Sequence, residues 1–200
     1  MKISWKHEHT ELDANSSIEK KIEVFRERVW GWQLHVADLA INGGKNHDET
    51  ADVQSLPHSG FTVLQILLSY FEMIARYETG NNGKDDSREL FVRGIQSVFP
   101  VVSTLPYAAT RTFLNQFYSN ARCGLYHMSM TGSGISIAPT GTPIAFADNP
   151  PHIVIDPHEL APAMKTHFAA YISRLNDPAE AELRKNFEKR FNHDYKARNA

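Results

Sequence analysis

Residues 61–77 constrain the fold of this chain more than any other segment, because they are apolar around most of the circumference of a helix. Their polar members recur at spacings of three and four, which places them on one narrow stripe. They are Thr62, Gln65, Ser69, Glu72 and Arg76. A helix of this kind needs neighbours on almost every side. The sequence therefore predicts a helical bundle with this segment at its centre and one polar seam along it.

A long amphipathic helix is predicted before the central one. Ser16 and Glu19 form a capping-box pattern at its start. Its apolar residues alternate between spacings of four and three and draw a single stripe, which faces either the core or a partner chain. They are Ile18, Ile22, Phe25, Val29, Trp32, Val36 and Leu39. We favour the core.

Beyond residue 107 the periodicity changes from helix to strand and back again. A helix over residues 107–127 carries one apolar face, made of Phe113, Phe117, Ala121 and Leu125. Alternation at every second residue then indicates short strands around Ile135/Ile137, Ile144/Phe146 and Ile153/Ile155. This β insertion, at about residues 133–156, is expected to be a β-hairpin or a three-stranded meander. Asp-Pro steps at 156–157 and 177–178 mark the starts of the last two helices.

Together these segments predict a mainly α fold, an up-down bundle of about six helices with the β insertion before the last two. Residues 1–15 are expected to form a flexible N-terminal arm, and residues 16–195 a single helical domain. The chain is 42% hydrophobic and 22% charged, which suffices for one ordinary core.

Composition restricts the functions that such a bundle can have. The formal net charge of −2 gives no global basic surface, so contact with nucleic acid requires a local patch. The basic residues at 184–190 alternate with glutamates, and we interpret them as a solvated helix face. The single cysteine, Cys123, and a polar N-terminus without a signal-peptide pattern predict a cytoplasmic protein. The longest apolar stretch is too short to cross a bilayer, so no membrane partner is expected.

The sequence lacks a Gly-rich phosphate loop with a lysine, a nucleophile elbow and a zinc-binding His-Glu-x-x-His helix. The pairs His7/His9 and His152/His158 have no third ligand at a suitable spacing. We therefore expect neither a metal site nor another cofactor.

Residues 117–127 are the most informative segment for function. They place Arg122 five positions before His127 at the end of a helix, with a Gly-Leu step between the two. This Arg-x4-His pattern resembles the R-x(4–6)-H motif of HEPN domains, and the resemblance implies a HEPN-like bundle with the motif on a late helix. A second match, Arg28-x6-His35, lies on the first long helix, and its part in the site is left open.

The resemblance implies a metal-independent endoribonuclease that acts as a homodimer, in a toxin–antitoxin or phage-defence system. Its partners would be RNA or a nucleotide, and an antitoxin protein. The chemistry suits the two residue types. A histidine can remove the 2′-OH proton or protonate the leaving 5′ oxygen, and an arginine binds phosphate oxygens in a bidentate fork. Two chains would supply one histidine each, so that one acts as acid and the other as base.

Three further residues complete the expected site. Glu72, on the polar seam, is expected to orient Arg122, as a carboxylate often does in the family. Asn120 and Tyr126 are expected to contact phosphate or to orient His127. On a regular helix the two motif side chains would point roughly 140° apart, so the helix must be disturbed near the glycine between them.

Cys123 departs from the family pattern, in which a polar residue usually follows the motif arginine. A thiol is a weak hydrogen-bond donor and behaves mainly as a small hydrophobe. The alternative is therefore a non-catalytic HEPN-like module that binds a nucleotide, RNA or a protein. Arg122 and His127 could also simply form a structural hydrogen-bond network at the helix end. A third function is a helical scaffold whose only activity is self-association.

Overall fold

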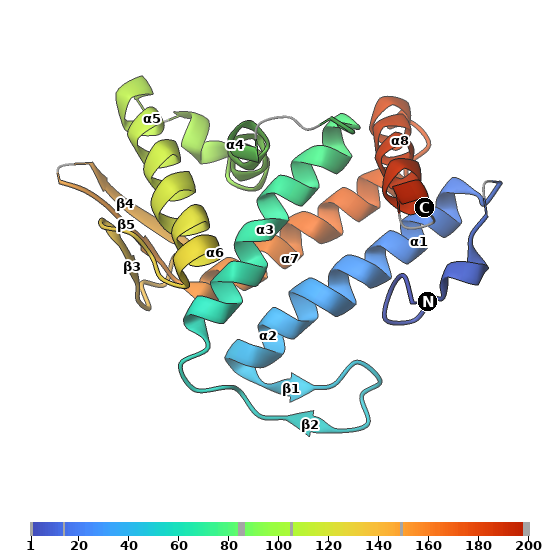
Figure 1. Cartoon of the computed structure of the whole chain (residues 1–200), viewed down its shortest axis with the longest axis horizontal. Coiled ribbons are helices and arrows are strands. Elements are labelled where there is room, and N and C mark those ends of the chain that lie inside the picture. Colours follow the sequence, from blue (N-terminus) through green and yellow to red (C-terminus); the bar gives the residue numbers. More distant parts are fainter. Residues whose placement is uncertain (1, 14, 84–86, 105, 149, 198–200) are drawn as a thin grey trace.

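The computed structural model shows a mainly α chain with a small sheet at one end (Figure 1). It describes residues 2–13, 15–83, 87–104, 106–148 and 150–197. The helices are η1 (His9–Glu11), α1 (Ile18–Val29), η2 (Trp30–Leu34), α2 (His35–Asn42), α3 (Gly60–Thr79), α4 (Ser87–Val98), η3 (Pro100–Thr104), α5 (Tyr107–Gln116), η4 (Phe117–Cys123), α6 (Gly124–Met128), α7 (Pro157–Asn176) and α8 (Ala181–Ala197). The strands are β1 (Gly44–Lys45), β2 (Asp52–Val53), β3 (Ile135–Ile137), β4 (Ile144–Asp148) and β5 (Pro151–Ile155).

The π-helical turns η2 and η4 join α1 to α2 and α5 to α6 without a break. The described residues therefore form six helical rods, with a three-stranded sheet before the last two, and this part of the predicted fold is confirmed. No helix within those residues combines the length and the apolar character that a membrane crossing requires.

α3 lies at the centre of the bundle, against α2, α4, α6, α7 and α8 (Figure 1). Most of its apolar side chains from Val63 to Tyr77 are buried in the core, and Ile66 and Met73 pack against it partly buried. Its polar seam runs between η2 and α6, and both neighbours bind it. The Gln33 side chain on η2 donates to Ser69 Oγ over 2.7 Å, and Gln65 donates to the Leu125 carbonyl oxygen over 2.6 Å.

The backbones of α3 and α4 touch at Gly94. A Cβ atom there would lie 1.9 Å from the carbonyl oxygen of Phe71, so only glycine fits. Beside this contact the rings of Phe71 and Phe91 pack edge to face, with their centres 5.4 Å apart.

The stripe predicted along the first long helix is correct only as far as Val29. Trp32 and Val36 are 43% and 39% exposed, so their predicted burial in the core is wrong. The cause is η2, because a π-helical turn holds an extra residue and rotates all that follows it. Leu34 and Ala37 face the core instead.

The β insertion has three strands, but the meander order is wrong. β5 lies in the middle, parallel to β3 and antiparallel to β4, with Ile153 and Ile155 fully buried. The connection between β3 and β4 therefore passes the end of β5. Buried Asp156 holds that connection, because its carboxylate accepts the backbone N–H of Thr140 at 2.7 Å and of Gly141 at 3.1 Å.

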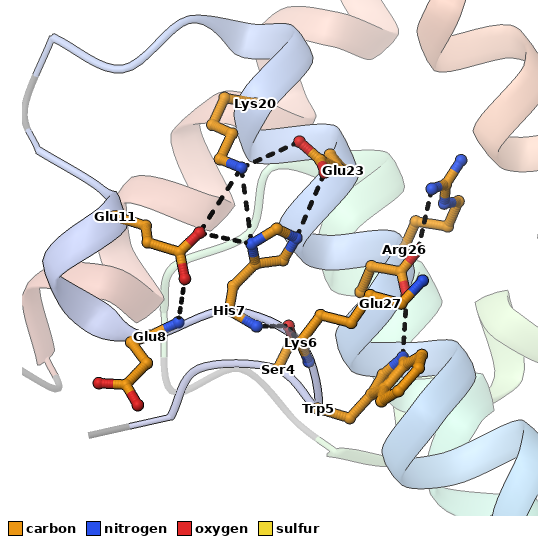
Figure 2. A network of polar contacts seen from close by, with 10 residues as sticks. All are labelled: Ser4, Trp5, Lys6, His7, Glu8, Glu11, Lys20, Glu23, Arg26 and Glu27. Atoms are coloured by element: carbon orange, nitrogen blue, oxygen red, sulfur yellow. Dashed lines mark hydrogen bonds and ion pairs between the residues drawn. The ribbon is translucent and has the colours of Figure 1, made fainter. Parts of the chain in front are cut away.

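The N-terminal segment lies against α1, where the sequence predicts a flexible arm (Figure 2). Ile3 and Leu12 are 3% and 6% exposed and belong to the core. Trp5 Nε1 donates to Glu27 over 2.8 Å, and the Trp5 ring covers Gly31, where any Cβ atom would collide with it. Isolated apolar residues carry no periodicity, so the sequence pattern does not indicate this packing. The division of the chain into an arm and one domain stays a prediction.

Polar contacts hold the same segment in place (Figure 2). The His7 ring lies between two carboxylates, with Nδ1 2.8 Å from Glu11 and Nε2 3.4 Å from Glu23. Lys20 on α1 reaches both carboxylates, at 3.8 and 3.1 Å. The segment is thus tied to α1 by opposite charges as well as by apolar packing.

A partly buried polar network joins α3, α4 and α7 around His167. Its Nδ1 lies 2.9 Å from the hydroxyl of Tyr70, and its Nε2 lies 3.1 Å from Ser97 Oγ, which donates to Glu78 over 2.7 Å. A neutral imidazole with its proton on Nε2 satisfies all of these contacts. Burial lowers the pKa of His167 below its ordinary value and raises the pKa of Glu78.

This network predicts a pH dependence of stability. The folded state favours neutral His167, whereas in the unfolded chain this histidine takes up a proton near its ordinary pKa of 6.5. As the pH falls through this range, the unfolded chain binds more protons here than the folded protein does. The free energy of unfolding therefore falls as the pH falls. We expect His167→Gln to lose less free energy of unfolding than the wild type between about pH 7.5 and about pH 5.5, measured by urea denaturation. Glu78 titrates in both proteins, so it does not explain a difference. Equal losses would contradict this role of His167.

Candidate functional site

η4 positions the arginine of the motif. This π-helical turn spans Phe117–Cys123, and such turns often occur at functional sites. The disturbance that the motif requires therefore lies just before Gly124, not at it. Gly124 has ordinary helical angles, but a Cβ atom there would lie 2.7 Å from the carbonyl oxygen of Met130. The glycine lets the chain fold back across the end of the helix.

The carboxylate of Glu72 joins two arginines. Its Oε2 lies 3.1 Å from Nη2 of Arg122, and its Oε1 lies 3.2 Å from Nη2 of Arg76. The contact predicted between Glu72 and Arg122 is thus confirmed. Ser87 Oγ also donates to Oε1 over 3.2 Å. One carboxylate between two guanidinium groups leaves a local excess of positive charge, which attracts anions.

Two tyrosines flank the guanidinium group of Arg122. Its Cζ atom lies 5.0 Å from the ring centre of Tyr126 and 5.8 Å from that of Tyr118. Both distances allow cation–π attraction. Tyr126 is 70% exposed, so much of its surface is open to a ligand.

Arg122 and Tyr126 line a groove of about 320 Å³ between α3, η4, α6 and α8. Its charged and aromatic lining includes Glu72, Arg76, Arg122, Tyr126, Arg190 and Asp194. Three arginines against two carboxylates leave one positive charge in the groove, although the whole chain has a formal net charge of −2. The groove is the kind of local patch that the composition demands of a nucleic-acid contact.

Arg190 and Asp194 close the far end of the groove. Arg190 donates to Asp194 over 2.5 Å and to the Asn81 carbonyl oxygen over 2.8 Å, while its buried Nε has no partner in the described part of the chain. Asp194 also accepts a hydrogen bond from the buried hydroxyl of Tyr77 over 2.7 Å. Sequence reasoning missed this pair, because their spacing of four is equally typical of a solvated helix face.

The second motif match does not form a site of its own. Arg28 donates to the hydroxyl of Tyr77, so it supports the wall of the groove from behind. His35 lies among other neighbours, stacked on Trp30 and edge-on to His47, and burial lowers its pKa. The turn η2 lies between Arg28 and His35, and the two side chains meet different parts of the bundle.

His127 lies beside the groove rather than in its lining. The imidazole is exposed, and its ring is edge-on to Tyr126 with their centres 5.4 Å apart. It therefore stands at the margin of the groove, next to the aromatic side chain that flanks Arg122.

Asn120 has a structural role, because its hydrogen bonds go to the segment after α6. Its side-chain amide donates to the Ser133 carbonyl oxygen over 2.8 Å, and its backbone oxygen accepts from Gly132 over 2.7 Å. Both bonds fasten the segment after α6 to η4. Of the five predicted residues, the groove thus brings together Glu72, Arg122 and Tyr126.

Comparisons of the chain with protein-family models, with curated proteins and with solved structures find no match. Among the described residues, no group of three or more histidine, cysteine or acidic side chains is placed to hold a metal ion. The fold and the groove define a helical-bundle protein with an arginine-lined groove of net positive charge.

Proposed function

We propose that the protein is a metal-independent endoribonuclease that binds RNA in this groove and acts as a homodimer with a HEPN-like arrangement. The observation that carries the proposal is the arginine pair held by Glu72 on an open groove, with an exposed imidazole at its margin. RNA cleavage by the 2′-OH needs a cation beside the phosphorane and groups that move two protons. Arginine and histidine supply these without a metal ion.

Arg122 is suited to stabilise the charge that develops on the phosphate. Its guanidinium group is anchored by Glu72 and flanked by two aromatic rings, which limits its motion before the substrate arrives. A cation that is already in position needs no reorganisation when the charge develops, and this is the usual source of electrostatic catalysis. Tyr126 offers a ring on which a base next to the cleaved bond can stack.

His127 is suited to move the protons, but among the described residues the lining of the groove adds no second histidine. A base for the 2′-OH and an acid for the leaving oxygen therefore require a second chain. Exposed apolar side chains on η2, α2, α3 and α6 favour self-association. They are Trp32, Val36, Phe61, Tyr126 and Met128. Association through Tyr126 and Met128, which flank His127 in the sequence, would bring two His127 side chains together.

An endoribonuclease of this kind needs restraint in the cell that makes it. A toxin–antitoxin or phage-defence setting, with an antitoxin protein as partner, is therefore part of the proposal.

The test uses purified protein and single-stranded RNA in EDTA. We expect the wild type to cleave the RNA, and to leave a strand with 2′-deoxy sugars intact, because the 2′-OH is the nucleophile. Arg122→Ala should lower the rate about 10²–10³-fold, as loss of a group that stabilises transition-state charge does. Arg93→Ala, on an exposed face of α4, is the matched control and should cleave like the wild type. An Arg122→Ala protein that is as active as the control would refute the proposal.

Specific observations favour a second candidate, a module that binds RNA or a nucleotide without cleaving it. Glu72 already partly neutralises Arg122, His127 lies outside the groove lining, and Cys123 follows the arginine. This candidate predicts RNA binding that depends on Arg122 and no cleavage by any variant. Light scattering separates the two further, because only the nuclease needs a dimer.

A further inference from the structure

We infer that Arg190 and Arg76 form a second phosphate subsite, so that the groove holds single-stranded RNA with one phosphate at Arg122 and the next at this pair. The inference rests on the proposed function, because it concerns the same groove. It assigns a substrate class and a positioning role to an arginine of α8 that lies outside the motif.

The groove has length enough for more than one nucleotide. Its α3 lining runs from Gln65 to Tyr77, and at a rise of 1.5 Å per residue this distance is about 18 Å. Tyr126 lies toward the Gln65 end, since Gln65 binds the carbonyl oxygen of the neighbouring Leu125. Arg122 meets Glu72 in the middle, and Arg76 lies one helical turn beyond it. A ligand with a single phosphate would leave the last part of the groove empty.

Arg76 and Arg190, at the α8 end of the groove, are each held by two hydrogen-bond partners and still have N–H donors that these partners do not use. Arg76 binds Glu72 and the Gly83 carbonyl oxygen, the latter over 3.1 Å. Arg190 binds Asp194 and the Asn81 carbonyl oxygen, but its buried Nε has no acceptor among the described residues. An unmade hydrogen bond of a buried group costs free energy. A small turn of the Arg190 guanidinium toward a phosphate oxygen would satisfy this donor.

The size of the groove selects a single strand. A volume of about 320 Å³ receives nucleotide units one after another, not a base-paired helix. An exposed tyrosine beside a row of cations is the usual means of binding single strands with little sequence preference, because every base can stack on a ring. We therefore expect weak dependence on base identity and strong dependence on strand length.

The test measures RNA binding in a His127→Ala background, so that cleavage does not interfere. Titration calorimetry compares a uridine dinucleotide with one phosphate against a trinucleotide with two. Adding Arg190→Gln should weaken trinucleotide binding about ten-fold and leave dinucleotide binding within about two-fold. For a longer strand, the slope of log K against log salt should fall in magnitude by about 0.7, the loss of one phosphate contact.

Arg93→Gln is the matched control and should change neither quantity. If Arg190→Gln does not fold, Arg76→Gln tests the same subsite from α3. Arginine variants that bind both lengths like their parent, with an unchanged salt slope, would overturn the inference, as would equal affinity for duplex RNA. Failure of the nuclease proposal is a separate result. If the wild type binds RNA with this length dependence but never cleaves it, the subsite inference is supported and the nuclease proposal is wrong.

Discussion

Replacing His127 by alanine is expected to lower the rate of RNA cleavage about 10²–10⁴-fold, the usual contribution of general acid–base catalysis. RNA binding should stay within about two-fold of the wild type, because the side chain lies outside the lining of the groove and the arginines remain in place. The measurement is the cleavage rate in EDTA at saturating RNA, with affinity determined separately.

His193→Ala provides the matched control. His193 is an exposed histidine of α8, so its loss removes the same side chain from a surface position. The control should cleave RNA like the wild type. If His127→Ala also cleaves at the wild-type rate, another group moves the protons and the assignment of His127 is wrong.

Gly94→Ala is expected to destabilise the fold by about 3 kcal/mol or more, at the upper end of overpacking substitutions. The added methyl group would lie 1.9 Å from the carbonyl oxygen of Phe71, a backbone atom that moves only if α3 and α4 separate. For a chain of this size the melting temperature should fall by about 6–12 °C. Thermal unfolding followed by circular dichroism measures the change.

The control for this substitution is Gly60→Ala, at the first residue of α3. A Cβ atom there meets Ile137 at 3.6 Å, an ordinary contact, so the stability should change by less than about 1 kcal/mol. A similar loss in both variants would show that close backbone approach at Gly94 is not the cause. Because Glu72 follows Phe71 directly, separation of the two helices would also disturb the groove.

The sequence predicts the helices and strands well because their periods differ. The apolar face of residues 107–127 is buried as predicted, and the polar seam of α3 identifies the central helix. The periodicity of apolar residues does not show where the π-helical turns lie, because the extra residue in such a turn has no characteristic residue type. This is why the predicted stripe fails at Trp32. Strand order is equally hidden, because alternation shows where strands lie and not which of them pair.

The part of the site that could be predicted is the contact between the Arg122 motif and the polar seam of α3. Arg122 and Glu72 could be paired in this way, and the structure contains that contact. Arg190 and Asp194 could not be found, because only the packing of α8 on α3 decides which side of α8 faces the groove. Asn120 was assigned to the site by its proximity in sequence, but its hydrogen bonds belong to the chain that follows α6.

The order of the three-stranded sheet bears on how the protein is made. β3 and β4 have no mutual hydrogen bonds, since the strand synthesised last lies between them. In a nascent chain, β3 and β4 therefore remain unpaired until β5 has left the ribosome and can lie between them. Asp156, the next residue, both secures the connection that passes the end of β5 and caps α7. Sheet closure and the start of α7 are thus coupled to the same few residues during translation.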